Sequence, residues 1–278
     1  MTRTLAVLLL AIIVSPAALA DDTGLLVAQG FGTADGERFK GARAKMLARR
    51  AAITDGRRNL LETVEGVRIT SGTTVKDFVV EKDEIGTRVK GMLRGSFVIS
   101  EKVYEDSGSW VAEVEMALCM SGGPKQCERK PTLAQLMQPE LKAPAPEEMF
   151  SPTPEVLNTA VAVNTPGAAT ASTGLIVDAS AQNFSPMLDV RMRTQEGKEL
   201  YGPGHVKVGT DWLHWSRSVA SARDLTDIVG ASPLVVTVDS LGQSGELVVG
   251  QDSAIEVFQK NLKGGDFLKQ GKVIFVVN

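Results

Sequence analysis

The sequence predicts an α+β protein with two domains. Two changes of pattern indicate this class. In the first half, apolar residues recur at helical spacing over about residues 37–65 and then at alternate positions from Val89 onward. In the second half, short apolar runs typical of strands alternate with short helical stretches. We therefore expect an N-terminal β-α-β-β-β domain with one long helix packed on an antiparallel sheet, and a second small α/β or α+β domain.

The first twenty residues are typical of a cleaved secretory signal peptide. Arg3 is followed by an apolar run over residues 5–14, which Pro16 ends, and Ala18-Leu19-Ala20 forms a small-x-small cleavage site. The run is too short to cross a bilayer, although a retained anchor is the alternative. There is no cysteine near the cleavage site for lipid attachment. We expect a signal peptide over 1–20 and a periplasmic product with no direct membrane span, associated with the outer membrane only through partners.

Composition narrows the functional classes. The formal net charge is −3, which argues against nucleic acid as the main partner. Only 5% of the residues are aromatic and there are 2 histidines, which makes a metalloenzyme or a histidine-dependent hydrolase a poor fit. We expect no metal site, no cofactor and no enzymatic activity.

The two cysteines, Cys119 and Cys127, flank a Gly-Gly-Pro turn. An oxidising compartment favours a local disulfide between them. A redox-active pair is the alternative, but the spacing is not Cys-x-x-Cys. A bridge closing so short a loop is expected to stabilise the fold by about 2–3 kcal/mol.

A proline-rich stretch divides the chain. Seven of the 12 prolines fall between Pro131 and Pro166, and Ala143-Pro144-Ala145-Pro146 lies among them. Such a segment buries little apolar surface and predicts an extended linker. The expected boundaries are a first domain over 21–132, a linker over 133–172 and a second domain over 173–278.

In the first domain, a short strand is expected over 24–33 and a long helix over about 37–65, ended by Gly66. The apolar residues of this helix are expected to share one face: Phe39, Ala42, Met46, Ile53, Leu60 and Val64. Alternation from Val89 to Val103 and from Trp110 to Leu118, around the turn at residues 106–108, predicts a hairpin. Residues 75–84 predict a further strand more weakly.

In the second domain, the pattern predicts strands over 174–179, 233–238, 246–249 and 273–277, and a hairpin over 190–201 that turns at Glu196-Gly197. Residues 216–229 are expected to be helical and to stop at Gly230. Ser253 and Glu256 have the spacing of a capping box for a last helix, which Gly264-Gly265 ends.

Gly30-Phe31-Gly32, between a predicted strand and a predicted helix, has the start of a dinucleotide-binding motif. The third glycine of that motif would fall at Asp35, whose carboxylate would repel a pyrophosphate. We therefore interpret the segment as a turn, with Asp35 and Glu37 at the start of the helix.

The long helix carries eight basic residues, three of them at seven-residue spacing: Arg43, Arg50 and Arg57. They lie about 40° round the helix from the predicted apolar face. Such a row can bind anionic lipid, polysaccharide or an acidic edge of a neighbouring subunit, or it can be a solvated flank whose stems pack on the sheet rim. These three arginines are interface candidates.

Trp212 and Trp215 bracket His214, with Asp211 and Ser216 adjacent. A hydrolase triad has to be assembled in three dimensions, and no Gly-x-Ser-x-Gly motif accompanies these residues. Neither His214 nor His205 has a second ligand at metal spacing. The two tryptophans are expected to be core or contact aromatics and are the second pair of interface candidates.

Several of these segments also resemble a known family. Gly30-Phe31-Gly32, Ala42-Arg43-Ala44 with the helix that follows, Leu60-Leu61-Glu62 leading to Gly66-Val67, and Val89-Lys90-Gly91 together resemble the Lpp-twenty lipoproteins and the N-terminal domain of the flagellar assembly protein FlgT, to which FlgP is also similar. The resemblance covers about residues 24–120, and the C-terminal part resembles an extension domain. It implies a small α+β domain used in rings or disks around the flagellar motor, with no catalytic residues. The missing acylated cysteine is a departure from the lipoprotein members.

These observations lead to one hypothesis and one alternative. The hypothesis is a non-catalytic periplasmic structural or assembly protein, a subunit of a flagellar-motor-associated ring or disk, that forms a homo-oligomer or contacts flagellar or outer-membrane-associated proteins. The alternative is a periplasmic module that binds envelope polysaccharide or lipid through the basic helix or the Trp212–Trp215 region.

Overall fold

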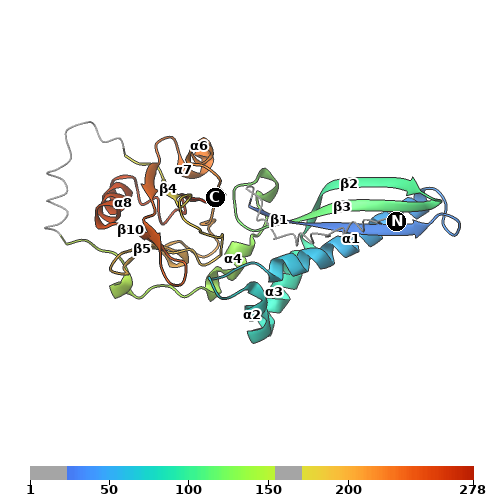
Figure 1. The fold of residues 1–278 in the computed structure, drawn as a ribbon, viewed down its shortest axis with the longest axis horizontal. Helices are drawn as coiled ribbons and strands as arrows, with labels where there is room; N and C mark the ends of the chain where they lie inside the picture. Colours follow the sequence, from blue (N-terminus) through green and yellow to red (C-terminus); the bar gives the residue numbers. More distant parts are fainter. Residues whose placement is uncertain (1–23, 154–170) are drawn as a thin grey trace, which may run out of the picture.

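The computed structural model describes residues 24–153 and 171–278. Both parts mix helices and sheets, which confirms the α+β class. The N-terminal part is long and narrow and projects from the second (Figure 1). The predicted signal peptide lies outside the described residues, as do residues 154–170 of the predicted linker.

The N-terminal part contains a three-stranded antiparallel sheet in the order β1-β3-β2. Its strands are β1 (Leu25–Asp35), β2 (Phe97–Asp106) and β3 (Ser109–Cys119). The last two strands form the predicted hairpin, which turns at Ser107 and Gly108, both with positive φ. Ser109 and Asp35 pair at the far end of the sheet, so all three strands run its full length.

Helix α1 (Ala42–Glu65) covers one face of this sheet, as predicted, and ends at Gly66. The face that it buries differs from the prediction. The buried residues recur every four positions and most are small: Ala44, Ala48, Ala52, Gly56, Leu60 and Val64. Met46, predicted to be in the core, is 54% exposed. The predicted face was right in part, since Leu60 and Val64 are buried and Phe39 and Ile53 pack against the core, but Ala42 and Met46 are exposed. The prediction followed the large apolar side chains, whereas the contact with the sheet selects small ones.

The reason is a very close approach between α1 and β1. A Cβ added at Gly30 would lie 2.3 Å from the Ala52 carbonyl oxygen, and one at Gly32 would lie 2.2 Å from the Ala52 nitrogen. The two glycines therefore lie inside the strand, where they let the two backbones touch, and not in the predicted turn. Asp35 does shape the turn that follows, since its carboxylate accepts a hydrogen bond from the Glu37 amide at 2.8 Å.

The free edge of β1 is also covered by α1. Asp55 Oδ2 accepts a hydrogen bond from the Phe31 amide at 3.0 Å, and Asn59 Nδ2 donates one to the Gln29 carbonyl at 2.8 Å. An edge strand with unpaired amides invites pairing with another chain, and these side chains satisfy part of that edge.

Two helices replace strands that the sequence predicted. Residues 75–84 were expected to be a strand, but α2 (Val75–Glu81) and α3 (Asp83–Arg94) occupy this region. The prediction that Val89 begins the alternating run was also wrong. The buried residues Ile85, Val89, Met92 and Leu93 have helical spacing, and their odd-numbered members imitated a strand. The order is thus β-α-α-α-β-β, and the sheet has three strands.

The first part of the predicted linker is folded. Helix α4 (Leu133–Met137) begins with a capping box between Thr132 and Gln135, and its residues Leu133 and Met137 are fully buried. Further along, the Phe150 amide donates a hydrogen bond to the Glu199 carbonyl at 2.8 Å. Residues 133–150 therefore form a strap on the second domain, because their few large apolar side chains are spaced to reach its core.

The second domain contains two four-stranded sheets. One is parallel, in the order β7-β11-β4-β8, and the other is mixed, in the order β6-β5-β10-β9. The strands of the parallel sheet are β4 (Leu175–Asp178), β7 (Trp215–Ser216), β8 (Leu234–Thr237) and β11 (Val273–Val276). Those of the mixed sheet are β5 (Met192–Thr194), β6 (Glu199–Tyr201), β9 (Ser240–Leu241) and β10 (Leu247–Val249). The predicted strands and the predicted hairpin of this domain are confirmed.

The helices of the second domain follow the sequence pattern with two exceptions. The helix predicted over 216–229 is two short helices, α6 (Val219–Asp224) and α7 (Thr226–Val229), and the second ends at Gly230 as predicted. Helix α8 (Gln251–Lys263) ends at Gly264, also as predicted. The predicted capping box was wrong, because α8 begins two residues after β10 with Gly250 as its N-cap. Ser253 and Glu256 therefore lie within the helix.

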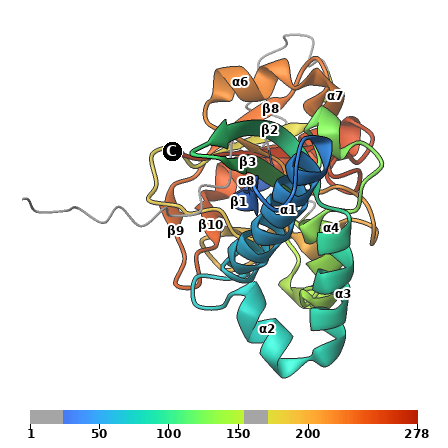
Figure 2. The ribbon, with the colours of Figure 1, turned by 90° about the vertical axis from the view of Figure 1, so that its right-hand side faces the viewer.

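One hydrophobic core runs through both parts of the molecule, from Ala44 on α1 to Val277 near the C-terminus. The loop after α1 also joins the second domain, since Leu188 and Asp189 donate backbone hydrogen bonds to Arg68 and Ile69 at 2.9 and 2.8 Å. In the end-on view, α1 lies on one side of the sheet and α2 and α3 extend away from it (Figure 2). Within residues 24–153 and 171–278, none of the helices combines the length and apolar character that a bilayer crossing requires.

The contact between α1 and β1 can be tested with Gly30→Ala. The added methyl group meets backbone atoms that cannot move without shifting the helix, so we expect the free energy of unfolding to fall by roughly 3 kcal/mol. Gly91→Ala on α3 is the matched control, since nothing lies within 4 Å of its added Cβ. That change should leave stability unchanged or raise it by about 0.5–1 kcal/mol. Urea unfolding followed by circular dichroism measures both, and equal stabilities would contradict the close contact.

Candidate functional site

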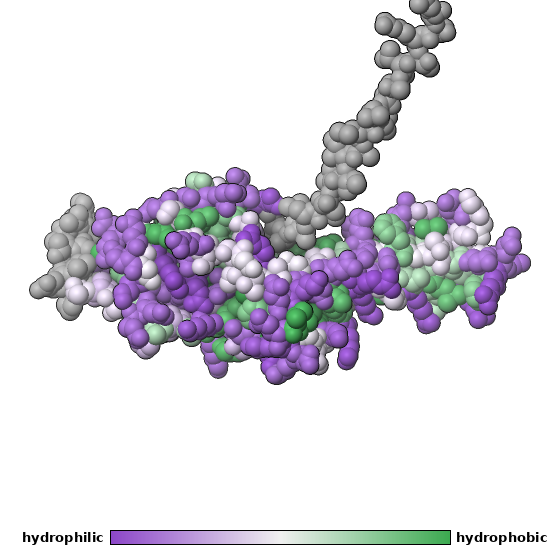
Figure 3. Space-filling model, turned by 60° about the horizontal axis from the view of Figure 1, so that its bottom comes forward, coloured by the Kyte–Doolittle hydropathy of each residue, from purple (hydrophilic) through white to green (hydrophobic). Residues whose placement is uncertain are grey.

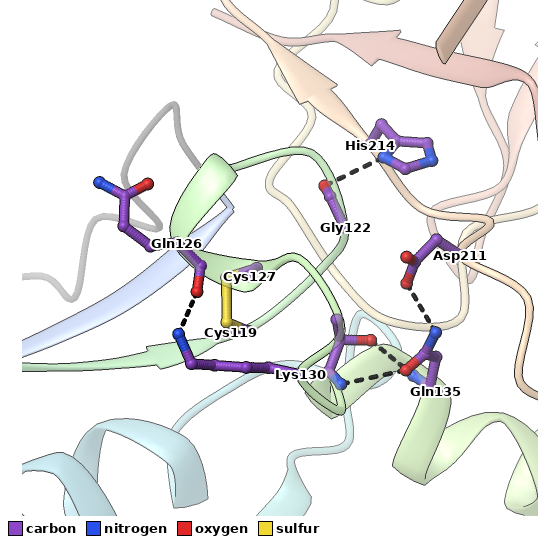
Figure 4. Close-up of a disulfide and its surroundings, with 9 residues drawn as sticks. Cys119, Gly122, Gln126, Cys127, Lys130, Gln135, Asp211 and His214 are labelled. Atoms are coloured by element: carbon purple, nitrogen blue, oxygen red, sulfur yellow. Dashed lines mark hydrogen bonds between the residues drawn. A yellow bond between two sulfur atoms is a disulfide. The ribbon is translucent and has the colours of Figure 1, made fainter. Parts of the chain in front are cut away.

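The predicted disulfide is present at the joint between the two parts (Figure 4). Cys119, the last residue of β3, is bonded to Cys127, with 5.8 Å between their Cα atoms. The bridge packs with Leu25, Ala117 and Phe97 in a small core on the sheet face opposite α1. Lys130 crosses the same loop, since its Nζ donates to the Gln126 carbonyl. The disulfide thus fixes residues 119–130 against the near end of that face.

This loop and helix α4, which follows it, are each hydrogen-bonded to the second domain, as drawn in Figure 4. His214 Nδ1 lies 3.0 Å from the Gly122 carbonyl oxygen, so Nδ1 carries the proton and donates it. Gln135 Nε2 donates to Asp211 Oδ1 at 2.8 Å and to the Gly209 carbonyl at 3.0 Å. The two parts are therefore held by directional contacts as well as by their shared core.

A cleft of about 250 Å³ opens at this joint. It is lined by the disulfide loop on one side and by His214, Trp215, Leu225 and Ile228 on the other. Burial lowers the pKa of His214, although the hydrogen bond to Gly122 and the nearby Asp211 charge oppose the shift. The imidazole is therefore neutral at pH 7, and it serves as a structural donor to the loop.

The second domain also contains a buried ionic cluster that the sequence did not reveal. Glu199, whose side chain is fully buried, pairs with Arg191 at 2.9 Å and Arg193 at 3.4 Å, and His205 Nε2 lies 3.5 Å from its Oε1. Burial would raise the pKa of Glu199, but His205 and Arg191 together lower it below the usual range. Arg191 also donates to the Lys142 carbonyl at 2.5 Å. The cluster therefore anchors the strap and has a structural role.

The two tryptophan candidates lie in the core. Trp212 is 0% exposed and Trp215 is 6% exposed, and the ring of Trp215 packs 5.5 Å from that of Phe275. The Trp212 side chain does not reach the surface, and Trp215 only borders the cleft at the joint. Burial thus supports the interpretation of both as core aromatics and not as interface residues.

The three arginine candidates lie on the opposite side of α1 from the sheet. Arg43, Arg50 and Arg57 are all exposed. At about 100° per residue, they lie about 140–180° round the helix from Ala52, so they face outward instead of flanking the core. Within the described residues, no ion pair or hydrogen bond engages the guanidinium groups of Arg50 and Arg57, whereas that of Arg43 stacks on Phe39 at 5.2 Å.

The sheet face opposite α1 is a second exposed surface, which sequence reasoning missed. Phe31, between the two buried glycines, points outward and is 55% exposed. It pairs across the strands with Glu113, which accepts a hydrogen bond from the Tyr104 hydroxyl at 2.7 Å. Glu115 and Gln29 form the next row toward the disulfide. The signal was available in the sequence, since Phe31 occupies an outward position of an alternating strand.

The site residues differ in how far they are already engaged. Within the described part of the chain, no group of three or more His, Cys, Asp or Glu side chains is arranged to hold a metal ion. The titratable groups at the joint, His214 and Asp211, are both engaged in contacts between the two parts. The exposed arginines and the open sheet face, by contrast, have room for a partner.

Comparison with known proteins relates the second domain to a described family. Residues 174–278 match the family model described as Treponema pallidum Tp0624, second domain. This match covers the two four-stranded sheets and the helices between them, which together define a mixed α/β module. No curated protein matches the chain.

The disulfide should contribute to stability. Replacing both cysteines, Cys119→Ser with Cys127→Ser, should lower the free energy of unfolding by about 2–3 kcal/mol, because it releases a short loop. Urea unfolding of the variant and of the wild type gives the difference. Wild type unfolded in dithiothreitol should match the variant. A reductant effect that persists in the double variant would show that the bridge is not its cause.

His214 should make stability depend on pH. Since burial depresses its pKa in the folded state, the unfolded chain binds more protons below about pH 6.5. The stabilisation is fully present above that pH and is lost as pH falls toward the folded pKa, with a slope of at most about 1.4 kcal/mol per pH unit.

His214→Asn, which keeps a donor for Gly122, should flatten this slope between pH 7.5 and 5.5. The difference between variant and wild type isolates His214, because burial raises the pKa of Asp211 and Asp189, which contribute with the opposite sign. Urea unfolding at several pH values measures it, and parallel curves would refute the assignment.

Proposed function

We propose that this protein is a non-catalytic, exported structural or assembly protein of the periplasm, and that it acts through its N-terminal part. The observation that carries the proposal is the projection of this part from the second domain (Figure 1), with exposed side chains on two of its faces within the described residues. One face is the outer side of α1, with its row of exposed arginines, and the other is the open sheet face around Phe31.

Rigidity supports the same proposal. The projecting part is fixed by a shared core, the loop contacts of Arg68 and Ile69, and the joint at Gly122 and Gln135. A part held in this way can present its surfaces in a defined direction, which an assembly subunit requires. The disulfide Cys119–Cys127 supports an oxidising compartment, in agreement with the leader.

We also propose where in the cell envelope the protein assembles. The resemblance of residues 24–120 to the Lpp-twenty and FlgT N-terminal domains supports a subunit of a ring or disk associated with the flagellar motor. We also propose that attachment near the outer membrane occurs through protein partners. Homo-oligomerisation is part of this proposal.

The mass of the mature chain in solution tests the proposal. Size-exclusion chromatography with light scattering should give a mass above one chain that rises with concentration. In cells, deletion of the protein should remove density at the flagellar motor in tomograms and reduce motility. A strictly monomeric protein at high concentration, together with unchanged motors and motility, would contradict the proposal.

A further inference from the structure

The outer side of α1 carries an apolar residue between cations. Met46 is 54% exposed, and Arg43 and Arg50 lie three residues before it and four after it, which places all three on one surface. Arg57 extends the row by two turns. Hydrophobic residues lie among hydrophilic ones on the projecting part in Figure 3.

The open sheet face carries the opposite arrangement. Phe31 is 55% exposed on this face, on the edge strand β1. Its cross-strand neighbour is Glu113, and Glu115 lies one row away. Acidic residues exceed basic ones on this face, since Lys102 is accompanied by Glu113, Glu115, Asp35 and Asp106 at the outward positions of the three strands. This face is therefore acidic, with the exposed aromatic ring of Phe31 near one edge.

The two faces lie on opposite sides of one layer made of a helix and a sheet. We propose that the outer side of α1 in one copy of this chain docks on the open sheet face of the next copy. Arg43 and Arg50 then face Glu113 and Glu115, and Met46 contacts the ring of Phe31. Arginine–carboxylate pairs fix the register, and thioether–aromatic contacts add affinity.

The charges favour a second copy over another anionic partner. A lipid or polysaccharide surface would satisfy the arginines, but it would contact only the helix face and would leave the acidic face and Phe31 without a partner. Because the two docking faces differ, the contact is head-to-tail, and repetition gives a ring or an open chain. This inference rests on the proposed assembly function and specifies the contact through which it occurs.

The test uses one variant on each face. Arg50→Glu reverses one charge on the helix face. Phe31→Asp removes the exposed aromatic side chain from the sheet face and adds a negative charge to those of Glu113 and Glu115. Each variant alone should weaken self-association of the mature protein at least tenfold in light scattering or sedimentation velocity. Lys90→Glu, an equal charge change at an exposed residue of α3, is the matched control and should assemble like wild type.

An equimolar mixture of the two variants separates the possible geometries. In a head-to-tail contact, the intact helix face of Phe31→Asp docks on the intact sheet face of Arg50→Glu, and the two defective faces repel each other. The mixture should therefore form a one-to-one dimer and nothing larger. Two sheet faces docking on each other would instead leave Arg50→Glu unaffected and the mixture without this dimer, which would overturn the proposal.

The other outcomes are also decisive. If wild type assembles and neither variant weakens assembly, the contact lies elsewhere and the assembly function stands. If wild type is monomeric at all concentrations, the assembly function itself fails. A third outcome is that both variants associate as strongly as wild type, while wild type binds phosphatidylglycerol vesicles and Arg50→Glu does not. That result would assign the helix face to an anionic surface instead.

Discussion

The contact between α1 and β1 is the constraint on which the N-terminal part depends. Gly30 and Gly32 allow the helix backbone to contact the strand, and the helix residues that face the strand are alanines and Gly56. A helix that packs so closely cannot place large side chains beneath itself. Met46 is therefore displaced to the surface, and Phe31, flanked by two glycines, can only point to the other face. The close contact thus produces both exposed surfaces.

A second constraint sets the direction in which this part projects. The disulfide holds residues 119–130 on the near end of the open sheet face, so only the far end, around Phe31, stays uncovered. In the same loop, the Gly122 carbonyl oxygen accepts a hydrogen bond from His214 Nδ1. The disulfide therefore stabilises the loop and, through the loop, helps to orient the two parts.

Most strands could be predicted from the sequence, because their burial follows the alternation of side chains. The terminal strand β11 and the hairpin of β2 and β3 are examples. The errors arose where two periods coincide. Val89 and Leu93 are four residues apart and both odd-numbered, so they fit a strand or a helix, and packing against the rest of the chain decides in favour of α3.

The orientation of α1 and the role of the strap could not be predicted for a different reason. Hydrophobic patterning ranks Met46 above Ala48, but the contact with a glycine-containing strand reverses that order, and the reversal depends on residues about twenty positions away. Similarly, the composition of residues 133–150 suggests a linker, while Leu133 and Met137 are buried against a domain formed later in the chain. The buried partners of Glu199 likewise come together only in three dimensions.

The residues of the two exposed surfaces are not fixed by packing, unlike those of the core. Small residues beneath α1 are fixed by the fold, whereas Arg50 and Arg57 engage no described partner and the fold does not need them. Exposed methionine and phenylalanine side chains increase the risk of non-specific association unless charges around them select the partner. Here Met46 lies between arginines and Phe31 lies on a face where carboxylates exceed cations, so like faces repel and unlike faces attract. This arrangement favours ordered head-to-tail contact over random aggregation.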